Sequence, residues 1–214
     1  MEKLEIGSKD FIEQNRKEVL EILSKVNREG MDEFIEFLNN STFFSDPASS
    51  RYHANFPGGL AFHSYNLYKI CSRLNKLFNR GISEESIIIS SICHDLCKIG
   101  SYNIDNKWKK NSQGKWESYL TYCYNPNQVQ CLHGTESALI ASKYIKLTDE
   151  EQQAITYHMG AYGLSERDCN QMNNSIKKYP LVLLIQQADM ASAYFYEVQY
   201  DMDKIPGLNN LEIK

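Results

Sequence analysis

The stretch ICHDLCKIG, residues 92–100, places a histidine, an aspartate and a lysine at the end of an apolar run. A charged side chain in an apolar interior costs free energy unless a partner neutralises it. Asp95 can pair with Lys98 at i+3 spacing, but Asp189, within LVLLIQQADMASAYF, has no comparable partner nearby in sequence. A divalent metal ion pairs carboxylates and imidazoles at once. These residues therefore predict a metal site that includes His94 and Asp95.

The histidines add to this prediction only as a group, which consists of His53, His63, His94, His133 and His158. A single histidine on an apolar helix face is more often a packed core residue than a ligand. His133 and His158 could equally be exposed residues at helix ends. The acids in apolar segments change this interpretation, because a metal ion that neutralises their charge also binds imidazole ligands.

Helix geometry favours a shared cavity for the residues of the opening stretch. His94 and Asp95 are about 100° apart around a helix, so both can reach one cavity from different edges. Lys98 lies one turn further along and is placed to hold an anion bound to the metal. Cys93 and Cys97 are interpreted as packing residues.

The elements that must position these side chains are mostly helical. Amphipathic spacing predicts helices over residues 9–26, 31–40, 60–79, 84–98, 134–146, 149–159 and 180 to about 200. Ser83 is a plausible N-cap, and Thr148 with Glu151 predicts a capping box. Two aromatic, alternating segments around NSQG predict a β-hairpin. We therefore expect an all-α bundle with one inserted hairpin at about residues 102–124.

Composition narrows the class of protein. The 214 residues are 42% hydrophobic and 23% charged, as in soluble globular proteins. A net charge of −4 argues against a large nucleic-acid footprint but not against a small anionic ligand. No apolar run is long enough for a membrane span, and MEKLEIGSKD lacks the layout of a signal peptide. We expect a cytoplasmic protein with reduced cysteines.

The order of these residues resembles the HD-domain phosphohydrolase superfamily, an all-α, metal-dependent fold named for its adjacent His-Asp pair. The local contexts match as well, in GGLAFHS, CHDLCKIG, HGTESA, ITYHMG and QQADMAS. The resemblance covers about residues 50–195. We expect an HD domain over residues 46–200, with a helical extension (1–45) packed on it and a C-terminal tail (201–214).

The resemblance also implies a ligand set for one metal ion, namely His63, His94, Asp95 and Asp189. In members with two further histidines a second ion is bound, and here His133 and His158 would hold it with Asp95 as the bridge. Spacing alone does not distinguish one ion from two. Imidazole and carboxylate ligands suit Fe, Mn, Zn, Co or Ni.

Such a centre predicts phosphoester hydrolysis by metal-activated water, without a covalent enzyme intermediate. Asp95 would orient the nucleophile, and Lys98 would neutralise charge on the phosphate oxygens, so these two are the expected catalytic residues. Glu136, i+3 from His133, could orient that histidine or act in proton transfer.

The candidate substrate contacts are Lys98, Arg51, His53, Lys107 and Trp108. Arg51 and His53 could contact a phosphate or simply occupy a surface loop. The hairpin lysines alternate with Trp108 and Trp116, which indicates either a solvated edge or a cover that gives cations to phosphates and a ring to a base. The second interpretation favours a nucleotide or short oligonucleotide as the partner, with no long nucleic acid, no membrane and a homodimer as an option.

Two alternatives stay open at this point. In one, the protein is a non-catalytic module whose metal holds the fold while the pocket sequesters a nucleotide. In the other, it is a single-metal nucleotidase in which His133 and His158 contact the substrate.

Overall fold

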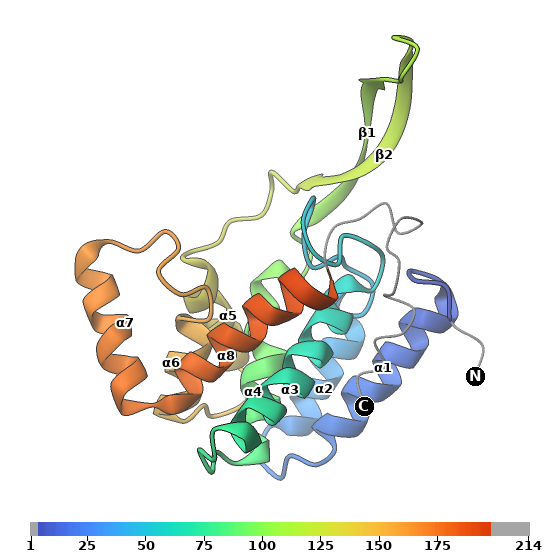
Figure 1. The fold of residues 1–214 in the computed structure, drawn as a ribbon. Helices are drawn as coiled ribbons and strands as arrows, with labels where there is room; N and C mark the ends of the chain where they lie inside the picture. The colour runs from blue at the N-terminus through green and yellow to red at the C-terminus, as the bar shows by residue number, and fades with distance from the viewer. Residues whose placement is uncertain (1–3, 198–214) are drawn as a thin grey trace.

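The computed structural model describes residues 4–197, in which a β-hairpin projects from a body of helices (Figure 1). The first helices are α1 (Lys9–Leu23), α2 (Met31–Asn40), α3 (Gly59–Leu77) and α4 (Glu84–Cys93). A 3₁₀ helix, η1 (Leu96–Lys98), leads into strands β1 (Tyr102–Lys110) and β2 (Trp116–Tyr124). The chain continues with α5 (His133–Ala141), α6 (Asp149–Thr156), α7 (Glu166–Lys178), α8 (Pro180–Ala191) and a π-helix, η2 (Ser192–Tyr196). The prediction of a mostly helical chain with one hairpin is confirmed.

Capping side chains set the starts of several helices. Ser83 accepts a hydrogen bond from the backbone N–H of Ser86 at the start of α4, as predicted. Thr148 and Glu151 form the predicted capping box at the start of α6. These caps fix where α4 and α6 begin. The C-terminal ends of the two helices lead to His94 and His158.

Helices α1, α3, α5 and α6 end earlier than predicted, at Leu23, Leu77, Ala141 and Thr156. Three further helices differ from the prediction in other ways. The first, α4, ends at Cys93, so the His-Asp pair lies between α4 and η1 and not within one continuous helix. The last, α8, ends at Ala191, where the backbone changes to the wider turn of η2. The polar helix α7 was not predicted, because its apolar stripe is short and consists of Cys169, Met172 and Ile176 in a segment that is otherwise polar. The predicted end of the last helix near residue 200 and the tail 201–214 lie outside the described residues.

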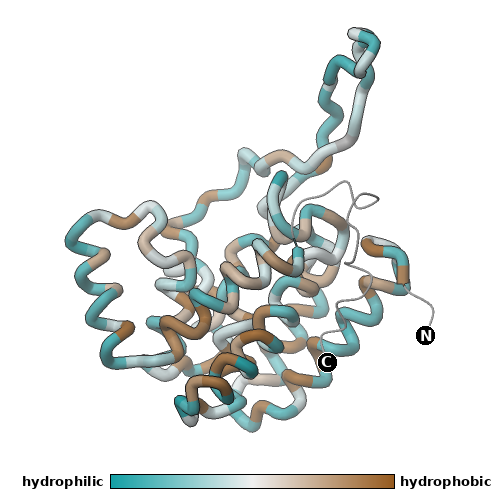
Figure 2. Tube along the Cα trace, in the orientation of Figure 1, coloured by the Kyte–Doolittle hydropathy of each residue, from teal (hydrophilic) through white to brown (hydrophobic). Residues whose placement is uncertain are grey.

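Within residues 4–197, the hydrophobic core consists of two clusters of buried side chains. One joins α1 and α2 to α3, α4 and α5, and includes Phe34, Leu60 and Ile88. The other lies between α3, α4, α6 and α8, and includes Leu67 and Ile185. Figure 2 shows the hydrophobic residues concentrated where the helices pack, whereas α7 and the hairpin are mostly hydrophilic. The N-terminal helices thus share a core with the helices that carry the predicted ligands.

None of the helices within residues 4–197 combines the length and the apolarity that a membrane span requires.

Candidate metal centre

The structure brings the six predicted ligands together from separate segments of the helical body. They are His63 in α3, His94 and Asp95 between α4 and η1, His133 at the start of α5, His158 after α6, and Asp189 in α8. His63, His94, Asp95 and His158 are each no more than 1% exposed. We refer to these six residues as the candidate metal centre.

Asp95 lies at the middle of the candidate metal centre. Its Oδ2 atom is 3.2 Å from Nε2 of His94 and 3.7 Å from Nε2 of His63. Its Oδ1 atom is 2.7 Å from Nε2 of His133 and 3.5 Å from Nε2 of His158. The two carboxylate oxygens therefore face two different pairs of histidines.

Asp189 completes the side of the centre that Oδ2 of Asp95 faces. Oδ1 of Asp189 is 3.1 Å from Nε2 of His63. The same nitrogen is 3.1 Å from Nε2 of His94. Two imidazole nitrogens and two carboxylates thus share one small volume, which is a donor set for a single ion.

Two imidazoles are oriented by the helix ends that precede them. Nδ1 of His94 is 2.7 Å from the carbonyl oxygen of Ser91, and Nδ1 of His158 is 2.7 Å from that of Ile155. Both carbonyls lie in the last turn of a helix, where backbone oxygens lack an intrahelical partner. The hydrogen bond at Nδ1 leaves Nε2 of each ring free to bind a metal.

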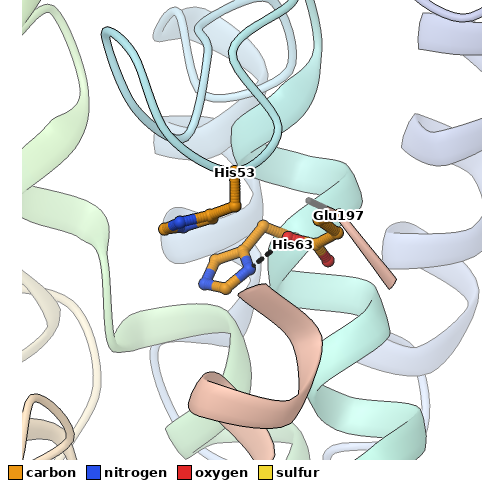
Figure 3. A group of neighbouring side chains, drawn as sticks. All are labelled: His53, His63 and Glu197. Atoms are coloured by element: carbon orange, nitrogen blue, oxygen red, sulfur yellow. Dashed lines mark hydrogen bonds and ion pairs between the residues drawn. The ribbon is translucent and has the colours of Figure 1, made fainter. Parts of the chain in front are cut away.

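His63 is oriented by Glu197, a residue that the sequence analysis did not identify. Nδ1 of His63 donates to Oε2 of Glu197 at 2.7 Å, as the dashed line in Figure 3 shows. Glu197 also accepts from Nδ2 of Asn66 at 2.9 Å and from Oγ of Ser192 at 2.5 Å. Its side chain is fully buried, and η2 carries it back toward α3. The signal for Glu197 was weaker than that for Asp189, since Glu197 follows the apolar segment and Asp189 lies within it.

The charges of the candidate metal centre are strongly coupled. Burial raises the pKa of Asp95, but Lys98, whose Nζ is 2.6 Å from Oδ2, and the histidines hold it well below its usual range. Burial also raises the pKa of Asp189, and the hydrogen bond from His63 more than offsets this, so the net shift is downward. Burial lowers the pKa of His63, but Glu197 and Asp189 overcome this and raise it to about 10. Both aspartates are therefore anionic at neutral pH.

His53 lies at the edge of the candidate metal centre. Its ring centre is 4.6 Å from that of His63. Figure 3 shows the two rings next to each other. Its Nε2 atom is buried and has no hydrogen-bond partner within residues 4–197. Burial, together with the positive charges of His63 and Lys98, lowers its pKa to about 3. His53 is therefore a neutral imidazole with a free nitrogen beside the ligands.

Cys97 contacts the centre, although its sequence position indicated only a packing role. Its Sγ atom is 3.1 Å from Nδ1 of His133, and it forms a group of possible donors with Asp95 and His133. Burial raises the pKa of Cys97 to about 12, so it is a thiol at neutral pH. A thiol at this position can fix the orientation of the His133 ring.

Four other candidate residues do not join this group among the described residues. Glu136 accepts a hydrogen bond from the backbone of Cys131, and within residues 4–197 it forms no hydrogen bond or ion pair with His133. Arg51 is exposed in the loop that also carries His53. Lys107 and Trp108 lie on the projecting hairpin (Figure 1), where Trp108 is 63% exposed.

The chemistry of the donor set fits a divalent transition metal, because the buried donors are imidazole nitrogens and carboxylate oxygens with their orientations already fixed. These groups could hold a metal ion, and their arrangement is compatible with a site of the HD type. In comparisons with known proteins, no family model, curated protein or solved structure matches the chain.

Proposed function

We propose that this protein is a metal-dependent phosphohydrolase of the HD type that cleaves a phosphoester of a nucleotide or short oligonucleotide. The observation that supports this most directly is the position of Asp95, whose two oxygens face separate pairs of histidines while Lys98 lies 2.6 Å from Oδ2. A carboxylate placed in this way suits a bridge between two ions.

In this proposal, His63, His94, Asp95 and Asp189 would hold the first ion. His133 and His158 would hold a second ion, and Asp95 would contribute to both positions. When bound, such ions polarise a phosphoryl oxygen and lower the pKa of water in the site.

The chain's own groups then bind and orient the reactants. Ionised Asp95 can accept a hydrogen bond from the attacking water and so direct it at phosphorus. Lys98 remains cationic, because Asp95 overcomes the effect of burial and raises its pKa. It can therefore neutralise the charge that develops on the non-bridging oxygens. The free Nε2 of His53 can donate to a phosphate oxygen from the opposite edge.

Elemental analysis of the purified protein, combined with a turnover screen over mono-, cyclic and oligonucleotides, tests the proposal. We expect one or two equivalents of a transition metal and metal-dependent release of a phosphoester product. The variant Asp95→Asn keeps the size of the side chain and should reduce turnover by about 100-fold or more.

Asp105→Asn, on the exposed face of the hairpin, serves as the matched control and should leave turnover of a mononucleotide unchanged. Protein free of transition metal, or undiminished phosphohydrolase activity in Asp95→Asn, would contradict the proposal. Tight nucleotide binding without turnover under every metal tested would instead favour a sequestering module.

A further inference from the structure

The β-hairpin has two chemically different faces. The strands pair antiparallel from Tyr102 opposite Tyr124 to Lys110 opposite Trp116. Because side chains alternate across a strand, the even-numbered residues of both strands share one face. Apart from Leu120, this face carries Tyr102, Ile104, Asn106, Trp108, Lys110, Trp116, Ser118, Tyr122 and Tyr124. We call it the aromatic face.

The aromatic face is exposed to an unusual degree for its composition. The exposed fractions are 66% for Ile104, 63% for Trp108, 63% for Trp116 and 55% for Tyr124. A two-stranded hairpin of this kind gains little stability from leaving large rings in water. The exposed rings therefore indicate a binding surface.

The charge of the hairpin indicates an anionic partner. Counted over both faces of the hairpin, Lys107, Lys109, Lys110 and Lys115 outnumber the acids Asp105 and Glu117, although the whole chain has a net charge of −4. Nζ of Lys110 lies 5.4 Å from the ring centre of Trp116 on the aromatic face. Lysines are depleted from the centres of protein interfaces, so this combination fits a second protein copy less well than a polyanion with flat rings.

The aromatic face begins beside the candidate metal centre. Tyr102 follows Lys98 closely in the chain, and the charge of Lys98 partly offsets the rise that burial causes in the pKa of Tyr102. The rings of Tyr102 and Tyr124 meet edge to face, with centres 6.1 Å apart. From Tyr102 to Trp108 the strand extends about 20 Å.

The base of the hairpin also faces the loop that carries His53. A cavity of about 190 Å³ lies between them, lined by Ser50, Asn55, Ile104, Thr121 and Tyr122. Two of these residues, Ile104 and Tyr122, belong to the aromatic face. The face therefore starts next to the candidate metal centre and its adjoining loop, and leads outward from them.

We propose that the aromatic face binds a single-stranded oligonucleotide, whose bases stack on Trp108 and Trp116 while one end of the strand lies at the candidate metal centre. Stacking on aromatic side chains beside lysines is the general way in which proteins hold single strands without reading their sequence. The position of the reacting end rests on the proposed function, whereas binding to the face does not.

Intrinsic fluorescence tests the proposal directly, because Trp108 and Trp116 are the two tryptophans of the chain. The full-length protein is titrated with a single-stranded homopolymer of about ten nucleotides, a size in the range that such surfaces hold. We expect saturable quenching of tryptophan fluorescence. Inorganic polyphosphate, which has the charge but no bases, should not quench it.

Variants locate the binding surface. With a labelled strand, the double variant Trp108→Ala/Trp116→Ala should bind at least about tenfold more weakly. Trp108→Phe/Trp116→Phe should retain most of the affinity, which separates loss of stacking from loss of folding. Tyr119→Ala removes an aromatic ring from the opposite face and should bind like the parent protein.

Equal affinity in the tryptophan-to-alanine variant and the parent protein would overturn the proposal. A change of tryptophan fluorescence with protein concentration in the absence of any oligonucleotide would also overturn it. Such a change would mean that the aromatic face binds a second copy of the chain. Asp189→Asn should leave strand binding intact. Normal turnover of a mononucleotide combined with tryptophan-independent strand binding would refute this inference alone, and tryptophan-dependent binding without turnover would refute the proposed function alone.

Discussion

Glu197 is the residue on which the orientation of His63 depends. Its carboxylate is fully buried and accepts from Nδ1 of His63, which directs Nε2 toward Asp189. A carboxylate that binds the outer nitrogen of a ligating histidine also raises the basicity of that ligand. Glu197 is thus a positioning residue for the candidate metal centre.

We expect Glu197→Ala to weaken metal binding by about 10- to 100-fold, because His63 loses the partner that fixes its tautomer. Glu197→Gln keeps an acceptor at the same place and should restore part of the affinity. Competition with a chromogenic chelator measures both. Glu136→Gln is the control, because Glu136 forms no hydrogen bond or ion pair with a histidine among the described residues. Equal affinities for Glu197→Ala and the parent protein would contradict this role.

We expect His63 to make metal binding depend on pH. Burial lowers its pKa, but Glu197 and Asp189 raise it to about 10. In the metal-free protein at neutral pH, both nitrogens of this ring therefore carry a proton. A metal ion that binds Nε2 must displace that proton. Metal affinity should therefore rise with pH, and binding near pH 7 should release about one proton from His63.

Calorimetric titrations in buffers of different ionisation enthalpy measure the released protons. The stability of the metal-free protein changes in the opposite sense. Because the folded-state pKa of His63 lies above its ordinary value of 6.5, its contribution is full below pH 6.5 and is lost as the pH rises toward 10. Metal binding near pH 7 without proton release would contradict this assignment.

At the scale of elements, a close approach of α5 and α6 brings His133 and His158 together. A methyl group at Gly134 would overlap the carbonyl oxygens of Ile155 and Thr156. These backbone atoms cannot yield as a side chain would, so only glycine fits here. The carbonyl of Ile155 is also the acceptor that orients His158.

Gly134→Ala should therefore destabilise the protein by about 1–3 kcal/mol, even though alanine favours helices. It should also lower the affinity for a metal ion at His133 and His158 more than the affinity at His63 and His94. Thermal unfolding and metal stoichiometry measure the two effects. Leu139→Ala changes an exposed residue of the same helix and should alter neither by a comparable amount. A Gly134→Ala variant that is more stable and binds two ions normally would refute the argument.

The candidate metal ligands that could be inferred from sequence were those whose burial would cost free energy in the absence of an ion. His94, Asp95 and Asp189 lie in strongly apolar segments, and the structure places all three in one group. Glu197 could not be assigned to His63, because the π-helix η2 breaks the helical spacing on which such an assignment depends. Similarly, α7 has only a short apolar stripe in an otherwise polar segment to reveal it. The neutral state of His53 follows from its three-dimensional neighbours and has no local sequence signal.

At the scale of the whole molecule, Arg28 joins parts that lie far apart in the chain. Its guanidinium contacts Glu85 of α4 at 2.5 Å and Glu151 of α6 at 2.7 Å. It also donates to the carbonyl of Lys146. Burial raises the pKa of Glu151, but Arg28 reverses this and the net shift is downward. One cation thus holds the N-terminal helices to the helices that carry the histidines.

Arg28→Met should destabilise the protein by about 3 kcal/mol, because it leaves the buried carboxylate of Glu151 without a cation. The double variant Arg28→Met/Glu151→Met should lose less than the sum of the two single variants. Because the pKa of Glu151 lies below its ordinary value of 4.5, its ionised carboxylate stabilises the fold at pH values above 4.5. This contribution is lost as the pH falls, so Glu151→Gln should lose less stability than the parent protein between neutral and acid pH. Denaturant unfolding at several pH values measures these differences, and strict additivity would contradict the linkage.

The order of the site residues along the chain has a consequence for biosynthesis. His63, His94 and His158 come first, whereas Asp189 and Glu197, which both contact His63, come near the end of the described residues. Because a protein is made from its N-terminus, these two carboxylates leave the ribosome after the histidines. A nascent chain with its imidazoles already folded would therefore bind metal only weakly. Tight metal binding would mark a chain whose synthesis has passed Glu197.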